Sequence, residues 1–227
     1  PFPNNPTGAV MEREDLEAVA EVLRGTDIMV LSDEIYAELT YGDQPHTSIV
    51  SLPGMQERTL LINGFSKAFA MTGWRLGYLC GPAPITKMIV KLHQFGIMSA
   101  PTTAQYAAIE ALSSPESEIE GMVNVFAARR KKMLETIAKI DGLSAVEPDG
   151  AFYVMLAVNG IYGKRYAGKT IDGSIAFSDA LLEAEKVATV PGVSFGADDC
   201  VRLSYSLSLE DIEEGLGRIA RFVAALE

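Results

Sequence analysis

The sequence is poor in cysteine and histidine. Its 227 residues include two cysteines, Cys80 and Cys200, and two histidines, His46 and His93. Two cysteines are too few for a disulfide framework, and these four side chains do not fall at metal-ligand spacings. We therefore expect no metal site and a reducing, cytoplasmic setting. Cys80 lies in an apolar run, so it is expected to be buried.

Positive charge and long apolar runs are also scarce. Lys and Arg number 19 against 30 Asp and Glu, which gives a net charge of −11 at pH 7. Phosphate contacts need clustered basic side chains, so this balance argues against a general nucleic-acid binder or a binder of anionic membranes. The basic cluster from Arg129 to Lys132 spreads around a helix, as a solvated face does. No uninterrupted apolar run reaches the ~18 residues of a membrane-spanning helix, and no signal peptide is visible.

What the sequence does contain is an alternation of helical stripes and apolar strands. Hydrophobic residues make up 48 % of the chain, enough for a substantial core. Residues 11–24 predict a helix, and residues 28–31 predict a short buried strand that leads to Asp33. This alternation predicts an α/β layer with a parallel sheet, in which ligands bind beyond the carboxyl ends of the strands. Asp33 stands at such an end, although a lone acidic residue there is more often a cap or turn former.

A glycine-punctuated loop carries two cations between two further predicted strands, 59–63 and 76–80. The loop contains Ser66, Lys67 and Arg75. By residue type alone, Lys67 and Arg75 are solvated surface side chains. Polar loop residues mounted on a rigid sheet are also where function concentrates.

The rest of the chain predicts a second, smaller domain of the α+β type. We expect a partial large domain over residues 1–114, a long linking helix over 115–141 and a small domain over 142–227. The elements predicted after residue 83 are helices at 84–98, 102–112, 115–140, 174–185 and 209–226, strands at 152–156, 187–190 and 201–205, and an exposed, mobile loop at 161–173.

Arg202 lies within one of these apolar strands. A buried arginine is costly unless it is paired. It therefore either neutralises an internal carboxylate or binds an anionic ligand, and the spacing alone favours neither.

Four motifs in a fixed order resemble the fold-type I pyridoxal-phosphate enzymes, specifically the class I/II aminotransferases of the aspartate aminotransferase type. The resemblance implies a mostly parallel large domain of three α/β/α layers, a small C-terminal α+β domain and pyridoxal 5′-phosphate as cofactor. The motifs are Asn5-Pro6-Thr7-Gly8, Asp33-Glu34-Ile35-Tyr36, Ser66-Lys67 followed by Gly73-Trp74-Arg75-Leu76-Gly77, and Arg202-Leu203-Ser204.

The same resemblance implies roles for the catalytic residues. Lys67 forms an imine with the cofactor aldehyde and, once freed by substrate, moves the Cα proton. Asp33 keeps the pyridine nitrogen protonated, which makes the ring an electron sink. Asn5 and Tyr36 hydrogen-bond the phenolic oxygen of the cofactor. Glu34 receives no role, and His46, alone in a loop, is expected to be exposed.

It also implies roles in binding. Ser66 and Arg75 anchor the cofactor phosphate, more so because Gly64 occupies a position where many relatives carry Ser. Arg202 holds the α-carboxylate of the substrate in a bidentate fork, which favours the ligand over the internal ion pair. Asn5 also belongs to the predicted substrate site.

The predicted function is transfer of an amino group from an L-amino acid to a 2-oxo acid. A carbon–sulfur lyase or an aminocyclopropane-carboxylate synthase would share every motif, and a ligand-sensing domain of a transcription regulator is a non-enzymatic alternative. The sequence does not specify the amino donor or acceptor. Because the chain opens at Pro1-Phe2-Pro3 without an initiator methionine, we expect part of a longer protein. The resemblance implies that the full-length protein is a homodimer, and that this part is poorly active alone because the family's upstream region supplies further cofactor contacts.

Overall fold

The computed structural model describes residues 1–42 and 45–227. Contacts divide the chain into two compact units. The first comprises residues 1–5, 9–123 and 149–151, and the second comprises residues 6–8, 124–148 and 152–227. The boundary falls within the long helix α4 (Glu116–Ile137), which has 22 residues and ends three residues before the predicted end.

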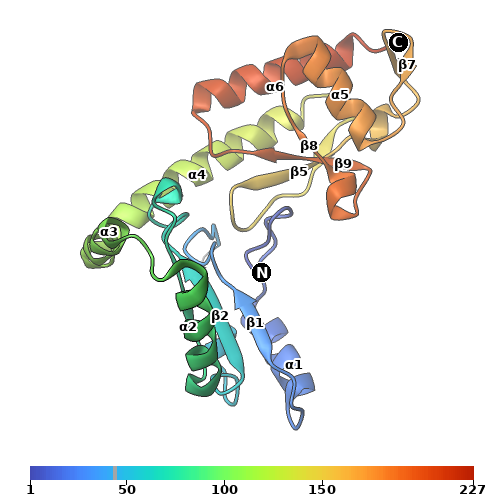
Figure 1. The fold of residues 1–227 in the computed structure, drawn as a ribbon. Coiled ribbons are helices and arrows are strands. Elements are labelled where there is room, and N and C mark those ends of the chain that lie inside the picture. Colours follow the sequence, from blue (N-terminus) through green and yellow to red (C-terminus); the bar gives the residue numbers. More distant parts are fainter. Residues whose placement is uncertain (43–44) are drawn as a thin grey trace. The chain divides into compact units, whose positions relative to one another are not determined.

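A three-stranded sheet forms the centre of the first unit (Figure 1). Its order is β1 (Val30–Asp33), β2 (Thr59–Gly64) and β3 (Gly77–Cys80). β1 and β2 are parallel, with Asp33 opposite Ile62, which confirms the predicted parallel pairing. β3 joins β2 in the antiparallel direction, which the sequence did not predict. Asp33 is the last residue of β1, as expected, although the strand begins two residues later than predicted.

The predicted burial of this sheet is partly wrong. Leu31 in β1 is 64 % exposed, Ile28 is 56 % exposed, and Cys80 at the end of β3 is also exposed. β1 and β3 are the two edge strands of the sheet, and each pairs on one side only. Apolar composition therefore identified the strands but not the elements that cover them.

Helices of the first unit supply two small cores. Leu16 and Ala20 of α1 (Arg13–Leu23) pack with Ile49, Leu52 and Met55 of the 3₁₀ turn η1 (Ile49–Ser51) and the segment after it. The second core joins Phe65 and Met71 to Ala108 of α3 (Thr102–Ser113). These packing partners flank the Lys67 loop, which contains the 3₁₀ turn η2 (Thr72–Trp74). Helix α2 (Ala83–Ile97) has no buried residue among those described.

The second unit is built on an antiparallel sheet with the strand order β4-β5-β9-β8. The predicted loop at 161–173 contains a short hairpin and two side chains that are 1 % exposed, Ile161 and Ile171, so the expectation of an exposed loop was wrong there. The elements of this unit are β4 (Ser144–Ala145), β5 (Tyr153–Ala157), η3 (Asn159–Ile161), β6 (Arg165–Tyr166), β7 (Lys169–Thr170), α5 (Ser174–Glu185), β8 (Val190–Pro191), η4 (Gly192–Phe195), β9 (Cys200–Ser204) and α6 (Leu209–Ala224).

Helix α6 shows how local sequence produces this packing. The Ser208 hydroxyl caps the helix by accepting a hydrogen bond from the Asp211 backbone N–H at 3.0 Å. A stripe at helical spacing then buries Ile212, Leu216 and Ile219. The cap and the stripe together fix both the start of the helix and the face that it buries.

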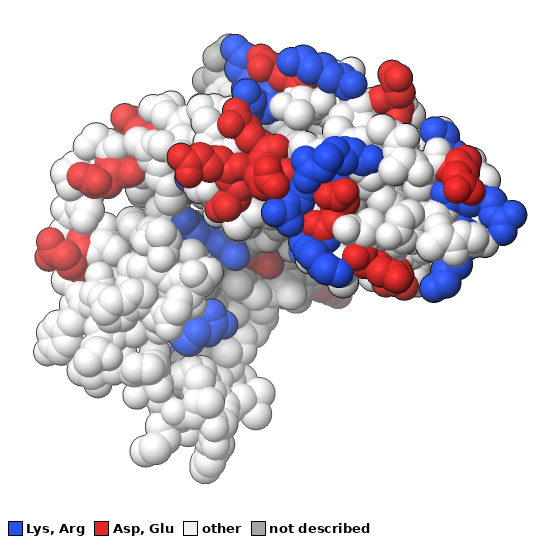
Figure 2. All heavy atoms as spheres, turned by 90° about the horizontal axis from the view of Figure 1, so that it is seen from above, with Lys and Arg blue, Asp and Glu red and all other residues white. Residues whose placement is uncertain are grey.

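The surface carries charges of both signs. On the face shown in Figure 2, acidic and basic side chains lie interspersed, and a broad area shows few charges. None of the helices in the described part of the chain is both long and apolar enough to cross a membrane.

Candidate active site

The loop that carries Lys67 is closed at its base and held by buried side chains. The Phe65 backbone N–H donates to the Leu76 carbonyl at 3.3 Å, and the Met71 N–H donates to the Phe65 carbonyl at 3.2 Å. Phe65 and Met71 are both less than 10 % exposed. At the base, a Cβ added to Gly64 would lie 3.0 Å from the Gly77 Cα, so the two strands approach closely there. The loop therefore has a defined shape around Lys67.

Lys67 has an altered ionisation equilibrium. Partial burial, together with the positive charge of Arg75, holds the pKa of Lys67 below its usual value. Its Nζ lies 5.6 Å from the centroid of the Tyr36 ring. A lysine that loses its proton more readily is a better nucleophile toward a carbonyl group.

Arg75 occupies a strained backbone conformation. Its φ and ψ are 53° and 49°, in the left-handed region, and its Nη1 donates to the Thr72 carbonyl at 2.7 Å. This conformation costs a non-glycine residue roughly 1–2 kcal/mol. Such strain concentrates at functional sites. Arg75 is exposed, and Ser66 is half-buried on the same loop.

The end of β1 lies beside this loop. The Asp33 Oδ1 accepts a hydrogen bond from the Ile35 backbone N–H at 3.2 Å, and Tyr36 is 6 % exposed. A Cβ on Gly64 would lie 3.3 Å from the Ile35 Cδ1, so the turn after β1 packs against the start of the Lys67 loop. Asp33 and Tyr36 thus lie at the same end of the sheet as Lys67, where β1 and β2 finish.

The first residues of the chain lie beside the end of β1. The Phe2 backbone N–H donates to the Asp33 carbonyl at 3.2 Å, and the Asn4 N–H donates to the Ala9 carbonyl at 2.8 Å. Asn5 is exposed in the turn that this second bond closes. The first unit therefore contains six of the seven predicted site residues, whose roles stay predictions: Asn5, Asp33, Tyr36, Ser66, Lys67 and Arg75.

Arg202, the seventh, belongs to the second unit. It lies in β9, opposite Met155 of β5 and Val190 of β8. Its guanidinium carbon is 4.5 Å from the centroid of the Tyr153 ring and 5.2 Å from that of Phe195. Stacking on aromatic faces stabilises a guanidinium group, and the planar fork of a guanidinium matches the geometry of a carboxylate.

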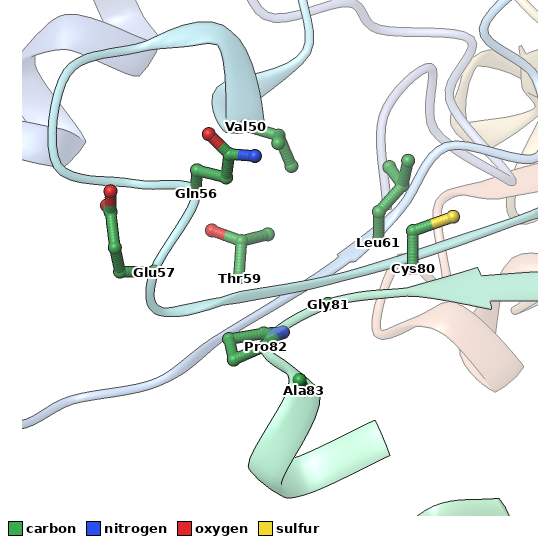
Figure 3. Close-up of a pocket in the computed structure, with 9 residues that line it drawn as sticks. All are labelled: Val50, Gln56, Glu57, Thr59, Leu61, Cys80, Gly81, Pro82 and Ala83. Carbon is green, nitrogen blue, oxygen red and sulfur yellow. The ribbon is translucent and has the colours of Figure 1, made fainter. Parts of the chain in front are cut away.

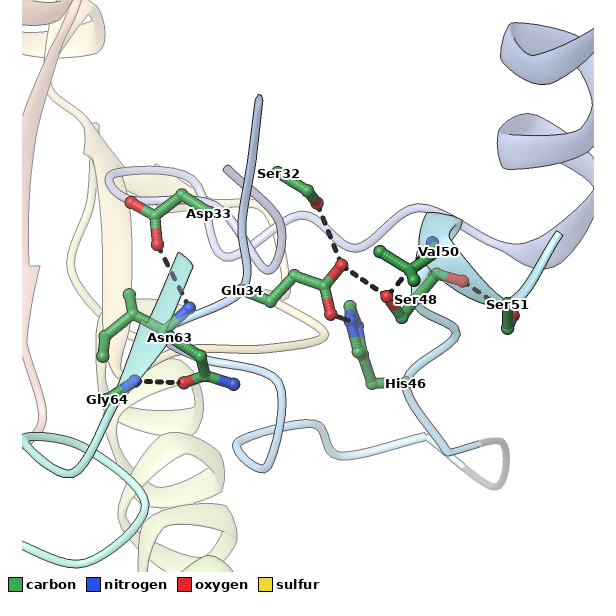
Figure 4. Close-up of polar contacts among 10 residues, drawn as sticks. Ser32, Asp33, Glu34, His46, Ser48, Val50, Ser51, Asn63 and Gly64 are labelled. Carbon is green, nitrogen blue, oxygen red and sulfur yellow. Dashed lines mark hydrogen bonds and ion pairs between the residues drawn. The ribbon is translucent and has the colours of Figure 1, made fainter. Parts of the chain in front are cut away.

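A polar cluster that involves Glu34 and His46 was not predicted from the sequence (Figure 4). The His46 side chain is 16 % exposed and its Nε2 lies 2.9 Å from the Glu34 Oε2, so its predicted exposure was wrong. Glu34, which received no role, is 5 % exposed. The pair is separated by 12 positions, and no local pattern predicts a contact across that interval.

A hollow lined by residues of β2 and β3 lies away from these residues (Figure 3). It measures about 670 Å³ and includes Thr59 at the start of β2 and Cys80 at the end of β3, whereas Lys67 follows the other end of β2. None of the predicted site residues lines it. Within the described residues, no group of three or more His, Cys, Asp or Glu side chains could hold a metal ion.

Comparisons with known proteins match nearly the whole length of the chain. The family model described as "Aminotransferase class I and II" matches residues 2–219. The aspartate aminotransferase of Geobacillus stearothermophilus is 43 % identical over 98 % of this chain and 56 % of its own length. A bifunctional aspartate and glutamate/aspartate-prephenate aminotransferase of Petunia hybrida is 40 % identical over 99 % of this chain and 48 % of its own length.

A solved structure agrees with these matches. The crystal structure of the aspartate aminotransferase from Rhizobium meliloti is similar with a TM-score of 0.95 and 34 % identity, over 100 % of this chain and 57 % of that one. The predicted α/β fold class is confirmed by this likeness. The chain spans about half the length of the relatives it matches.

Proposed function

The chain belongs to the aminotransferase class I and II family, and we propose that the protein transfers the amino group of an L-amino acid to a 2-oxo acid with pyridoxal 5′-phosphate as cofactor. The observation that carries the proposal is Lys67. Its pKa is lowered, its loop is anchored on both sides, and it lies beside Tyr36 at the carboxyl edge of β1 and β2. A reactive amine at that edge is what an aldehyde cofactor requires.

The side chains around Lys67 fit this cofactor chemically. A lysine with a lowered pKa suits the aldehyde, Arg75 and Ser66 suit the phosphate, and the Asp33 carboxylate suits the pyridine nitrogen. When bound, the cofactor supplies an electron sink for the bond broken at the substrate Cα.

Each residue then has a distinct task. The Lys67 Nζ holds the cofactor and afterwards takes the proton from the substrate Cα. The Asp33 carboxylate keeps a proton on the pyridine nitrogen. The Tyr36 hydroxyl and the Asn5 side chain hydrogen-bond the phenolic oxygen.

Binding the substrate requires a different group. We assign the α-carboxylate to Arg202, whose guanidinium stacks on Tyr153 and Phe195. A planar fork held against aromatic rings loses little freedom when it binds a carboxylate. Asn5 is the second residue proposed to contact substrate.

The same proposal includes the partners, the oligomeric state, the location and the domains of the protein. The partners are an amino acid and a 2-oxo acid, the working form is a homodimer, and the location is cytoplasmic. Helix α4 links a large domain, residues 1–114, to a small domain, residues 142–227. The net charge of −11 supports the absence of a nucleic-acid partner.

The experiment that tests the function separates amino transfer from elimination. The purified protein is incubated with a panel of amino donors and 2-oxoglutarate, and the products are identified. Formation of glutamate and the matching keto acid supports the proposal, and we expect Lys67→Ala to abolish it while the exposed Lys139→Ala does not. Release of ammonia and pyruvate without glutamate would support a lyase instead, although the relatives compared are named aminotransferases.

A further inference from the structure

We propose that Glu34 is a positioning residue: its buried carboxylate, held by Ser32, His46 and Ser48, fixes the turn that carries Asp33 and Tyr36. The inference rests on the proposed function, since it gives Asp33 and Tyr36 their importance. The Glu34 side chain is not proposed to contact substrate or cofactor. It acts through the backbone that it anchors.

The Glu34 carboxylate is engaged at both oxygens. Oε1 accepts hydrogen bonds from the Ser32 hydroxyl at 2.9 Å and the Ser48 hydroxyl at 2.8 Å. Oε2 lies 2.9 Å from the Nε2 of His46. A charge buried this deeply is tolerated only when such partners satisfy it.

The ionisation of Glu34 agrees with this geometry. Burial pushes its pKa up, but the hydrogen bonds from His46, Ser48 and Ser32 and the charge of His46 together outweigh burial and hold the pKa below its usual value. The carboxylate is therefore anionic at neutral pH. Three donors on one anion make a stronger tether than the same contacts to a neutral group.

One of the hydrogen-bond donors to Glu34, Ser48, lies next to an apolar core. Ser48 is the N-cap of η1, and its hydroxyl also accepts from the Val50 backbone N–H at 3.3 Å. The next residue, Ile49, packs in the core with Leu16 of α1. The segment that holds Glu34 is thus itself held by buried side chains.

The Glu34 backbone is held at the end of the sheet where β1 and β2 finish. The Glu34 backbone N–H donates to the Ile62 carbonyl at 2.8 Å, and its carbonyl accepts from the Ala37 N–H at 2.9 Å. Figure 4 shows the Glu34 side chain directed toward His46 and Ser48, with Asp33 on the opposite side, as alternation along a strand requires. Fixing Glu34 therefore fixes the direction in which Asp33 points.

The first test measures the anchor without cofactor. Amide hydrogen exchange over residues 33–37 is compared in the wild type, Glu34→Ala, and the control Glu38→Ala, an exposed glutamate four positions later. We expect exchange on the order of 10-fold faster in Glu34→Ala and unchanged in the control, because the turn opens locally more often. Equal exchange in the two variants overturns the proposal. Since no cofactor is present, this result stands whether or not the proposed function holds.

The second test measures the consequence in the cofactor-loaded protein. We expect Glu34→Ala to lower the kcat for amino transfer by on the order of 10- to 100-fold with little change in the KM for the amino donor, because orientation of catalytic groups is lost while substrate binding is not. Glu34→Gln keeps an oxygen for both serines and should recover most of the rate. Equal kcat in Glu34→Ala and Glu38→Ala overturns the proposal.

A milder variant covers the case in which Glu34→Ala does not fold. Ser48→Ala removes one donor and keeps the carboxylate, and we expect exchange over residues 33–37 to be roughly threefold faster. Unchanged exchange in Ser48→Ala overturns the proposal that the Glu34 carboxylate fixes this turn. If the wild-type protein shows no amino transfer at all, the proposed function fails, while the exchange data still decide the anchor.

Discussion

At the scale of single residues, the ionisation of Lys67 has two causes that can be separated. Partial burial disfavours the charged amine, and the neighbouring Arg75 cation disfavours it further. The folded chain therefore binds fewer protons than the unfolded chain at pH values between the lowered and the ordinary pKa of lysine. In that window stability rises with pH, and below it the charged Lys67 costs stability.

Arg75→Asn tests the electrostatic cause. Asparagine tolerates the left-handed backbone conformation of residue 75, so the variant removes the charge without adding strain. We expect the midpoint for modification of Lys67 by an amine-reactive reagent, followed by mass spectrometry of its peptide, to move to higher pH. The rise of stability with pH should weaken as well. Arg24→Asn, at an exposed arginine on the end of α1, should leave the midpoint unchanged, and a midpoint equally unmoved in Arg75→Asn contradicts the account.

At the scale of elements, close backbone approaches decide where side chains are forbidden. Gly192 opens η4 in the second unit, and an added Cβ would lie 2.1 Å from the Ala197 carbonyl oxygen and 2.2 Å from that of Cys200. Both neighbours are backbone atoms, which cannot rotate away. Gly215, within α6, has nothing within 4 Å of an added Cβ.

The two glycines therefore give a matched pair of substitutions. Gly192→Ala should lower the free energy of unfolding by about 1–3 kcal/mol through overpacking. Gly215→Ala should raise it by about 0.5–1 kcal/mol, because alanine loses less backbone entropy in a helix. Chemical denaturation of the second unit measures both, and a Gly192→Ala variant as stable as the wild type contradicts the described η4 geometry.

How far the sequence predicts these elements depends on how local their causes are. Helix α5 begins and ends at the predicted residues, Ser174 and Glu185, because its stripe lies within the helix itself. β1 is displaced from its prediction because its ends follow from pairing with β2. The Lys67 loop was found through its motif, whereas the contact of Glu34 with His46 depends on tertiary packing, which leaves no local pattern.

At the scale of the whole molecule, the described surface carries unusually exposed apolar side chains. Phe95 on α2 is 91 % exposed, Leu92 is 75 % exposed, and Tyr106 on α3 is 71 % exposed. Exposed apolar patches of this kind promote association.

The same substitution at two phenylalanines tests this description of the surface. Phe177 in α5 is 0 % exposed, so Phe177→Ala should cost about 3–5 kcal/mol in the free energy of unfolding. Phe95→Ala should change it by less than about 0.5 kcal/mol, because the ring already faces water. Light scattering on the same samples should show less self-association in Phe95→Ala. A large loss of stability in Phe95→Ala would mean that α2 is packed.

We propose above all that Lys67 is the residue to which the cofactor is bonded. The most direct measurement treats the protein with pyridoxal 5′-phosphate, reduces it with borohydride and maps the added mass to a peptide. We predict the added mass on Lys67, its loss in Lys67→Ala and its retention in Lys139→Ala. Added mass that persists on another lysine in Lys67→Ala would contradict the account.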